Sequence, residues 1–397
     1  MRFNSVLLWI ILLCVGSLGL TAASRSAIAQ DFEVPKINKY FPKSKLVVKR
    51  TQLTQAKFPV VDVHTHFGFK LKQDEEWLQD YVDVMDRQNI AISVSLDSKL
   101  GNEEEHLDFL KPHADRFLSF VNIDFVGSGD RKKPATFACN QPGFVRLTCE
   151  QLKAAKSKGI CGLKFFKSFG LELKKPDGTL YAIDDPIWFP IWETCGELGL
   201  PVIIHTADPM AFFDPNGPEN ERLEELLRHP DWSFHGDQFP SREELLEARN
   251  NVIRKFSKTK FIGAHVANSS EDLATVGQWL DEFPNLTVEI ASRIAELGRQ
   301  PYTAKAFFEK YQDRVLFGTD GPWSEVRLGY YWRFLETKDE YFPYSEKQPQ
   351  PQGFWNIYGV GLSDEVLQKI YFQNAFNVIP GLKAAYQNVG EVGESGN

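Results

Sequence analysis

Two histidines separated by one residue, His64 and His66, follow directly on an apolar stretch that begins at Val60. If Val60–His66 is a strand, the two imidazoles project from the same face, because side chains alternate along a strand. Neutral imidazole is a common ligand for zinc and for similar divalent ions. The pair therefore indicates a metal site, with two ordinary strand-edge histidines as the alternative.

Four further residues whose side chains could take part in chemistry lie within or at the end of an apolar run: Lys164, His205, His265 and Asp320. The remaining histidines lie in polar stretches: His106, His113, His229 and His235. Several imidazoles and a carboxylate are costly to bury unpaired, and a divalent cation would satisfy them. The sequence therefore predicts a bound divalent metal, with zinc as the preferred ion and either one or two ions in the site.

Short apolar runs alternate with amphipathic stretches, and the runs predict eight strands: Val60–His66, Ala91–Leu96, Leu118–Asp124, Ile160–Phe166, Pro201–Thr206, Phe261–Val266, Leu286–Ala291 and Val315–Asp320. Strands this apolar, each followed by a helical pattern, indicate a parallel sheet covered by helices. Eight such units predict an α/β protein with a (β/α)8 TIM barrel over residues 58–386. In such barrels the chemistry lies at the carboxyl ends of the strands, which is where the residues above fall.

Three of the loops that follow these strands are long: residues 126–147 after the third, 207–240 after the fifth and 321–362 after the eighth. Loops of this length in a compact domain are often functional. The last loop is rich in aromatic residues, of which Trp323 is the candidate for substrate binding, but we favour packing of the final helix Asp364–Asn377 or a subunit contact. Capping boxes predict helix starts at Ser241 and Thr148.

The residues at the two ends of the chain differ in composition from the predicted barrel. Residues 1–29 resemble a secretory signal peptide, with an apolar core and a small-residue cleavage site at Ala27–Ala29. Residues 30–57 form a polar lead-in, and the tail from residue 387 is expected to be disordered. We therefore expect an exported protein, periplasmic or secreted, with no retained membrane span.

Composition limits the partners. The 397 residues carry a formal net charge of −8, which argues against a nucleic-acid partner. Export would permit a disulfide between Cys139 and Cys149, whereas Cys161 and Cys195 lie in apolar segments and are expected to be free thiols.

The chain resembles the amidohydrolase superfamily of metal-dependent barrels, and within it the branch of aminocarboxymuconate-semialdehyde decarboxylase-like proteins. The resemblance covers about Phe58–Leu382 and rests on the five strand ends, read in order as VDVHTH, GLKFF, VIIHT, FIGAH and LFGTD. The resemblance implies that His64, His66 and His205 are metal ligands. It implies that Asp320 is a ligand and proton acceptor. His265 would be either a ligand of a second metal or the histidine that orients and deprotonates the water.

Lys164 and Arg293 leave alternatives open. In binuclear relatives a lysine at the end of the fourth strand reacts with carbon dioxide and bridges two metals. Otherwise Lys164 binds a substrate carboxylate or pairs with Glu289. Arg293, just after the seventh strand, could clamp a carboxylate or pair with Glu289 or Glu296. Asp62 either fixes an imidazole tautomer or tightens the barrel floor.

Three functions compete at this point. The first is an exported hydrolase in which metal-activated water attacks the carbonyl of an amide, ester or lactone, with Asp320 as proton acceptor. The second is a non-oxidative, metal-dependent decarboxylase of an aromatic or enoic acid. The third is an exported barrel that binds a ligand without catalysis. All three imply a small-molecule partner, and a homodimer is expected for barrels of this type.

Overall fold

The computed structural model describes residues 36, 39, 40 and 42–395, without the side chains of 390–395. The predicted signal peptide lies outside these residues. The chain divides into two units, Met1–Lys45 and Leu46–Asn397, and the second contains all the helices and strands discussed below. Its first residues are held at one point by Thr51, whose N and Oγ1 donate to the Asp339 carboxylate at 2.6 and 2.7 Å.

Eight parallel strands pair in chain order, and each of the eight predicted strands is present. They are β1 (Val60–Thr65), β2 (Ile90–Lys99), β3 (Phe117–Asn122), β4 (Gly162–Phe165), β5 (Val202–Ile204), β6 (Phe261–Gly263), β7 (Leu286–Glu289) and β8 (Val315–Leu316). Their apolar, β-branched residues are almost all buried, as expected for a parallel sheet covered on its outer face.

The last strand returns to the first and closes the ring. Val63 N donates to Phe317 O at 3.1 Å, and Asp320 N donates to His64 O at 2.8 Å. A parallel bridge between Thr65 and Gly321 extends this pairing beyond the end of β8. The predicted (β/α)8 TIM barrel is confirmed.

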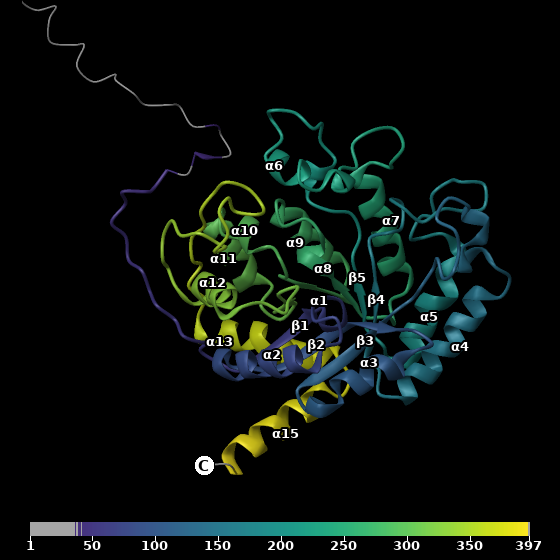
Figure 1. Cartoon of the computed structure of the whole chain (residues 1–397), viewed down its shortest axis with the longest axis horizontal. Helices are drawn as coiled ribbons and strands as arrows, with labels where there is room; N and C mark the ends of the chain where they lie inside the picture. Colours follow the sequence, from purple (N-terminus) through teal and green to yellow (C-terminus); the bar gives the residue numbers. More distant parts are fainter. Residues whose placement is uncertain (1–35, 37–38, 41, 396–397) are drawn as a thin grey trace, which may run out of the picture. The chain divides into compact units, whose positions relative to one another are not determined.

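The helices of the barrel are α1 (Phe67–Lys70), α2 (Glu75–Gln88), α3 (Glu103–Leu110), α4 (Phe144–Ser157), α5 (Phe189–Leu198), α6 (Leu223–Leu226), α7 (Arg242–Lys255), α8 (Ala264–Ala267), α9 (Leu273–Glu282), α10 (Ile294–Leu297), α11 (Pro301–Lys310), α12 (Glu325–Glu336), α13 (Asp364–Gln368), α14 (Asn374–Val378) and α15 (Leu382–Ser395). Figure 1 shows most of them outside the strands, with the loop that carries α6 at one end of the barrel and α15 at the other.

One of the two predicted helix starts differs from the structure. The capping box at Ser241 is present and begins α7, but Thr148 does not begin a helix. Instead α4 starts after Gly143, and the Thr148 hydroxyl donates to Phe144 O inside the helix. A Thr-x-x-Gln pattern on an amphipathic helix is therefore compatible with an interior position, where the hydroxyl binds the preceding turn.

Residues 387–395, part of the tail predicted to be disordered, are helical as the continuation of α15. Its apolar residues recur at helical spacing, and Ala385, Tyr386 and Val389 pack against a cluster that contains Val61 and Ile92. The Tyr386 ring stacks on that of Phe372 with centroids 5.3 Å apart. This partly buried stripe explains why the helix extends past the predicted end of the barrel.

All four cysteines among the described residues are free thiols, so Cys139 and Cys149 do not form the disulfide that export would permit. Cys195 is buried, as expected, and Cys161 is partly buried. Within the described part of the chain, no helix combines the length and the apolar character that crossing a bilayer requires.

Candidate active site

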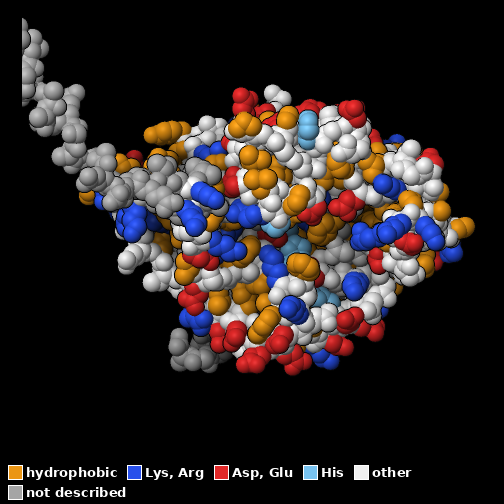
Figure 2. All heavy atoms as spheres, turned by 45° about the horizontal axis from the view of Figure 1, so that its top comes forward, with side chains coloured by type: hydrophobic (Ala, Val, Ile, Leu, Met, Phe, Trp, Pro, Cys, Tyr) orange, Lys and Arg blue, Asp and Glu red, His pale blue; other side chains and the backbone are white. Residues whose placement is uncertain are grey.

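The residues predicted to form a site line one cavity of about 760 Å³ at the carboxyl ends of the strands: His64, His66, Lys164, His205, His265, Arg293, Asp320 and Trp323. Figure 2 shows histidine side chains in a hollow on this face, with lysine and arginine side chains close by. The long loops after β5 and β8 supply much of the remaining wall. The structure therefore brings together every predicted site residue.

His64, His66 and Asp320 form one of two groups of possible metal ligands among the described residues, the other being His64, His265 and Glu289. Asp320 Oδ1 lies 3.3 Å from His66 Nε2 and 3.9 Å from His64 Nε2. The two imidazoles meet edge to face, with ring centroids 5.3 Å apart. Their Nε2 atoms thus face one carboxylate oxygen, which is the arrangement that a divalent cation between them would use.

Two carboxylates behind these imidazoles fix their orientation. His64 Nδ1 donates to Glu289 Oε1 at 2.9 Å, and His66 Nδ1 donates to Asp97 Oδ1 at 2.6 Å. A proton on Nδ1 leaves the Nε2 lone pair free for a metal, the pattern found behind most histidine ligands. Burial holds the pKa of His64 well below its usual value, so this imidazole is neutral.

Sequence reasoning missed both of these roles. Asp97 directly follows the predicted strand Ala91–Leu96, and Glu289 lies near the end of the seventh predicted strand. This is the same signal that identified Asp320. The sequence suggests Glu289 only as a partner for Lys164 or Arg293. That interpretation is wrong, because the Glu289 carboxylate binds His64 and two backbone N–H groups.

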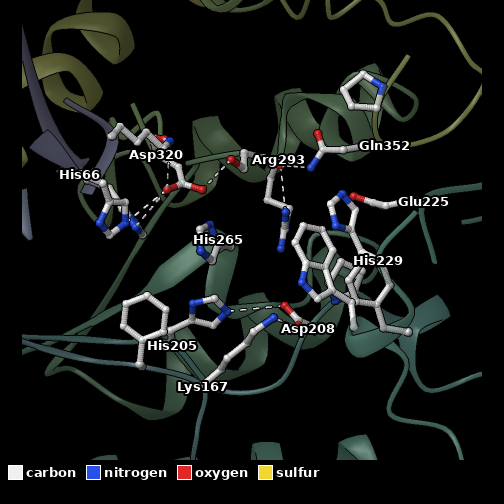
Figure 3. A pocket seen from close by; sticks show the side chains of 18 of the residues that line it. His66, Lys167, His205, Asp208, Glu225, His229, His265, Arg293, Asp320 and Gln352 are labelled. Atoms are coloured by element: carbon white, nitrogen blue, oxygen red, sulfur yellow. Dashed lines mark hydrogen bonds and ion pairs between the residues drawn. The ribbon is translucent and has the colours of Figure 1, made fainter. Parts of the chain in front are cut away.

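His265 lies between the His66–Asp320 group and His205, as Figure 3 shows. Its ring centroid is 4.9 Å from that of His64 and 4.6 Å from that of His205. Its Nδ1 donates to Ala291 O at 2.8 Å, so its Nε2 is the atom left for other chemistry. Burial lowers the pKa of both His205 and His265 well below the usual value.

His205 belongs to neither group of possible metal ligands and has a ring nitrogen without a hydrogen bond among the described residues. Its buried Nε2 has no hydrogen-bond partner among the described residues, and Asp208 Oδ1 lies 3.6 Å away. Asp208 also forms an ion pair with Lys167 (Figure 3). A buried nitrogen without a partner is costly, so this atom is consistent with a further ligand position.

Lys164 on β4 is almost fully buried, and its Nζ has no hydrogen-bond partner among the described residues. Burial lowers its pKa to about 8, although the Glu289, Asp320 and Asp97 carboxylates oppose the shift. The predicted pairing with Glu289 is therefore absent. The structure leaves open a lysine that binds a substrate group or is itself modified.

Arg293 is also buried, and no carboxylate of the described residues contacts it, so the ion pairs expected with Glu289 or Glu296 do not form. Its guanidinium donates to Ser292 O at 2.9 Å and weakly to Asn268 Oδ1 at 3.4 Å. Glu296 instead binds Arg222 at 2.6 Å. Arg293 therefore presents N–H donors to the cavity, and no carboxylate among the described residues accepts from them.

Most aromatic residues of the loop after β8 pack in or against the core, and Trp332 contacts Tyr371 of the predicted final helix, with ring centroids 5.8 Å apart. Tyr331, Trp332 and Tyr344 are fully buried. Trp323 does line the cavity, but its ring contacts Lys70 at 4.1 Å and Arg327 at 4.5 Å, and its Nε1 donates to Thr319 O. It therefore holds two cations at the wall in addition to any contact with a ligand.

Asp62 tightens the barrel rather than orienting an imidazole. Its Oδ1 accepts from His64 N and Thr319 N at 3.1 Å each, and its Oδ2 accepts from the Thr319 hydroxyl. Burial raises the pKa of Asp62 to about 7, although these hydrogen bonds oppose the shift. The carboxylate thus joins the ends of β1 and β8, the two strands that carry His64 and Asp320.

A sequence model of the amidohydrolase family matches residues 61–380, which is most of the barrel. The chain belongs to the amidohydrolase family. This family consists of metal-dependent enzymes, and the match includes every site residue described above. Comparison with curated proteins gave no match.

Solved structures similar to this amidohydrolase include 2,6-dihydroxybenzoate decarboxylase complexed with 2,6-dihydroxybenzoate, at 14% identity and a TM-score of 0.47 over 81% of this chain and 99% of that chain. Dihydroxybenzoic acid decarboxylase from Polaromonas sp. JS666, with manganese and 2-nitroresorcinol, shares 15% identity, with a TM-score of 0.45 over 81% and 96%. The phosphotriesterase homology protein of Escherichia coli, complexed with phosphate, shares 13% identity, with a TM-score of 0.39 over 80% and 97%.

The residues present in this amidohydrolase fit a divalent metal. The donors His64, His66 and Asp320 converge, and the Nδ1 atoms of both histidines are hydrogen-bonded outward. His205 adds a buried nitrogen that has no hydrogen-bond partner among the described residues. Borderline ions such as zinc accept this mixture of nitrogen and oxygen ligands.

Proposed function

We propose that the protein is a metal-dependent hydrolase that cleaves a carbonyl compound of the amide, ester or lactone type. The observation that carries this proposal is the environment of Asp320. Burial favours its protonated form, but the Lys70 ammonium, whose Nζ lies 3.9 Å from Asp320 Oδ1, outweighs burial and holds the Asp320 pKa well below the usual range. An ionised carboxylate beside the histidines can accept a proton from an attacking water and return it to a leaving group.

The chain's own residues hold the other reacting groups. A divalent cation at the His64, His66 and Asp320 donors would supply Lewis acidity toward a carbonyl oxygen and a water. Ser292 Oγ donates to Asp320 Oδ2 at 3.1 Å and orients this carboxylate. His265, with Nδ1 held by Ala291 O, presents Nε2 as an acceptor for a proton of the water.

Substrate contacts are assigned to Arg293, Lys164 and Trp323, which line the same cavity. Arg293 can bind a carboxylate of the substrate through two parallel N–H groups. Phe212 and Trp232, whose rings lie 6.1 Å apart in a stacked arrangement, form an apolar wall for the rest of the molecule.

A second candidate is a non-oxidative decarboxylase of an aromatic or enoic acid. The observation that favours it is the pair of buried cations, Lys164 and Arg293, for which the described chain provides no carboxylate in contact. A carboxylic acid substrate would satisfy them. The two candidates differ in whether the bound carboxylate serves for recognition or is the group that reacts.

The experiment is elemental analysis of protein purified without chelators, followed by assays of the metal-loaded enzyme. Carboxylate-bearing lactones, esters and amides are tested for hydrolysis, and aromatic and enoic acids for release of carbon dioxide. We expect one or two equivalents of metal, hydrolysis of at least one carbonyl substrate and its loss in Asp320→Asn. Release of carbon dioxide without hydrolysis would establish the decarboxylase. Failure of wild-type protein to bind zinc or manganese would overturn both candidates and favour a ligand-binding barrel.

We also propose that the enzyme is exported and that cleavage after Ala29 yields a mature chain that begins at Gln30. The support is the apolar amino-terminal segment and its small-residue cleavage pattern. Cell fractionation with amino-terminal sequencing tests this, and a cytosolic protein with its first 29 residues intact would contradict it. The expected homodimer stays a prediction.

A further inference from the structure

The backbone that carries His265 turns in the left-handed direction. Four consecutive residues, His265 to Asn268, have φ of 58°, 57°, 51° and 52°, so α8 is a left-handed turn rather than an ordinary helix. None of the four is glycine, and Val266 is β-branched. This conformation is unfavourable for every residue other than glycine, and bulky or branched residues are the most disfavoured. A turn this strained persists only where its surroundings hold it in place.

Two arginines of α7 hold the carbonyl groups of this turn. Arg249 Nη1 donates to Ala267 O at 2.7 Å, and Arg242 donates to Asn268 O. Arg242 also donates to Ser269 Oγ at 2.9 Å and to Asp208 O at 3.2 Å. Both guanidinium groups therefore bind the backbone after β6, and Arg242 also binds the backbone after β5.

Neither arginine has a carboxylate in contact among the described residues. Arg249 is 1% exposed and Arg242 is 6% exposed. The Arg249 guanidinium lies 4.3 Å from the Trp279 ring, and its other donors bind the Asn250 side chain. A buried guanidinium without an acidic partner is unfavourable unless its hydrogen bonds are satisfied. Two such guanidinium groups bind the same turn, which calls for an explanation beyond general stability.

We propose that Arg249 and Arg242 are positioning residues that fix His265 in the active site through the left-handed turn. The turn aims His265 N at Glu289 Oε1, at 2.7 Å, and the same oxygen accepts from His64 Nδ1. Glu289 thereby couples the orientation of His265 to that of a metal-ligand candidate. This inference rests on the proposed function only for the catalytic role of His265, and the arginines themselves touch neither substrate nor metal.

The test compares three variants of α7: Arg249→Met, Arg249→Lys and, as a matched control, Arg254→Met. Arg254 lies on the same helix but is exposed and paired with Glu282. The readout is the imidazole ¹H–¹⁵N spectrum of metal-free, ¹⁵N-histidine-labelled protein, with the His265 signals identified by their loss in His265→Gln. Thermal unfolding is measured in parallel as a report on general stability.

We expect Arg249→Met to shift, broaden or double the His265 signals, since the Ala267 carbonyl loses its donor. Arg249→Lys should restore them in part, because an ammonium can still donate to Ala267 O. Arg254→Met should leave them unchanged. A lower unfolding temperature in Arg249→Met with unchanged His265 signals would overturn the proposal and make Arg249 a purely structural residue.

If Arg249→Met does not fold, Ala267→Gly/Arg249→Met replaces it. Glycine adopts the left-handed conformation without strain but cannot replace the lost donor. We expect this double variant to fold with disturbed His265 signals, and undisturbed signals would again overturn the proposal. Where a hydrolysed substrate is known, kcat of the arginine variant should fall about ten- to a hundredfold with KM nearly unchanged. The spectra need no substrate, so they remain interpretable if the proposed hydrolase activity fails.

Discussion

Single carboxylates behind the imidazoles decide how the candidate ligands point. Asp97 accepts from His66 Nδ1 at 2.6 Å through Oδ1 and from Phe69 N at 2.9 Å through Oδ2. An asparagine has only one acceptor oxygen, so it cannot satisfy both donors. Asp97 therefore needs both oxygens of a charged carboxylate to orient His66 and to accept from Phe69 N.

We predict that Asp97→Asn weakens zinc binding by about tenfold to a hundredfold, the usual effect of losing an acid behind a histidine ligand. Competition with a chromogenic chelator measures the affinity. Asp83→Asn is the control, because Asp83 is exposed and only accepts from Gln79. Equal affinities in wild type and Asp97→Asn would show that His66 is oriented without this carboxylate, or is not a ligand.

Lys164 gives a prediction for the pH dependence of stability in the metal-free protein. Burial lowers its pKa from 10.5 to about 8 in the folded state. Between these values the unfolded chain holds the proton and the folded chain does not, so raising the pH through this window stabilises the folded state. Below pH 8 the full penalty of a buried ammonium, about 3 kcal/mol, remains.

Lys164→Met should therefore be more stable than wild type at pH 7, and the difference should shrink as the pH rises from 8 towards 10.5. Urea unfolding at several pH values measures it. Lys153→Met, at an exposed position of α4, should show no such trend. A constant difference across this range would mean that the Lys164 amine keeps its proton in the folded state.

The ends of neighbouring strands lie close together, and this spacing fixes the positions of the site residues that the strands carry. Gly318 lies two residues after the end of β8, next to Glu289 of β7 and His64 of β1. A Cβ placed there would lie 2.8 Å from Glu289 Oε2 and 3.2 Å from His64 Cβ. Glu289 cannot swing away cheaply, because it accepts from His64 Nδ1, His265 N and Ala291 N.

We predict that Gly318→Ala displaces the Glu289 carboxylate and weakens metal binding about tenfold or more, through loss of the His64 orientation. Isothermal titration with zinc measures this. Gly329→Ala on α12 is the matched control, since its Cβ meets nothing within 4 Å, and it should leave binding unchanged. Full zinc affinity in Gly318→Ala would show that β8 can move outward without cost to the site.

The order of the elements was predictable from the sequence, but the contacts between their ends were only partly so. Runs such as Val60–His66 fix each strand by their apolar, β-branched character, and the barrel follows from their number and alternation. The partner of His64 depends on which strand ends meet in space, so Glu289 was assigned to the wrong residue. The left-handed turn at His265 has no glycine to mark it, because buried arginines stabilise it from another helix.

The whole molecule combines an acidic chain with a cationic cavity. The formal net charge is −8, yet eight lysines and arginines and only four carboxylates line the cavity. The net negative charge of the chain and the excess of cations in the cavity have opposite effects on an approaching anion. The net charge repels it from a distance, whereas a low-dielectric hollow lined with cations concentrates the attractive field at its mouth.

The salt dependence of association decides which effect dominates. The test uses stopped-flow binding of the fluorescent 2-aminobenzoate anion, with neutral 2-aminobenzamide as the matched probe. If the cavity dominates, the association rate of the anion should fall roughly tenfold between about 0.02 M and 0.5 M salt, as screening shortens from over 20 Å to under 5 Å. A rate that rises with salt would mean that repulsion by the acidic surface governs the encounter.

The rim cations separate the two effects further. Arg228 and Lys347 are exposed at the mouth of the cavity, away from the buried Lys164 and Arg293. Arg228→Gln/Lys347→Gln should reduce both the association rate of 2-aminobenzoate and its salt dependence, while its dissociation rate changes little, because rim charges act on the encounter. Faster dissociation would instead place these two side chains in direct contact with the bound anion, so that the cationic subsite would extend to the mouth of the cavity.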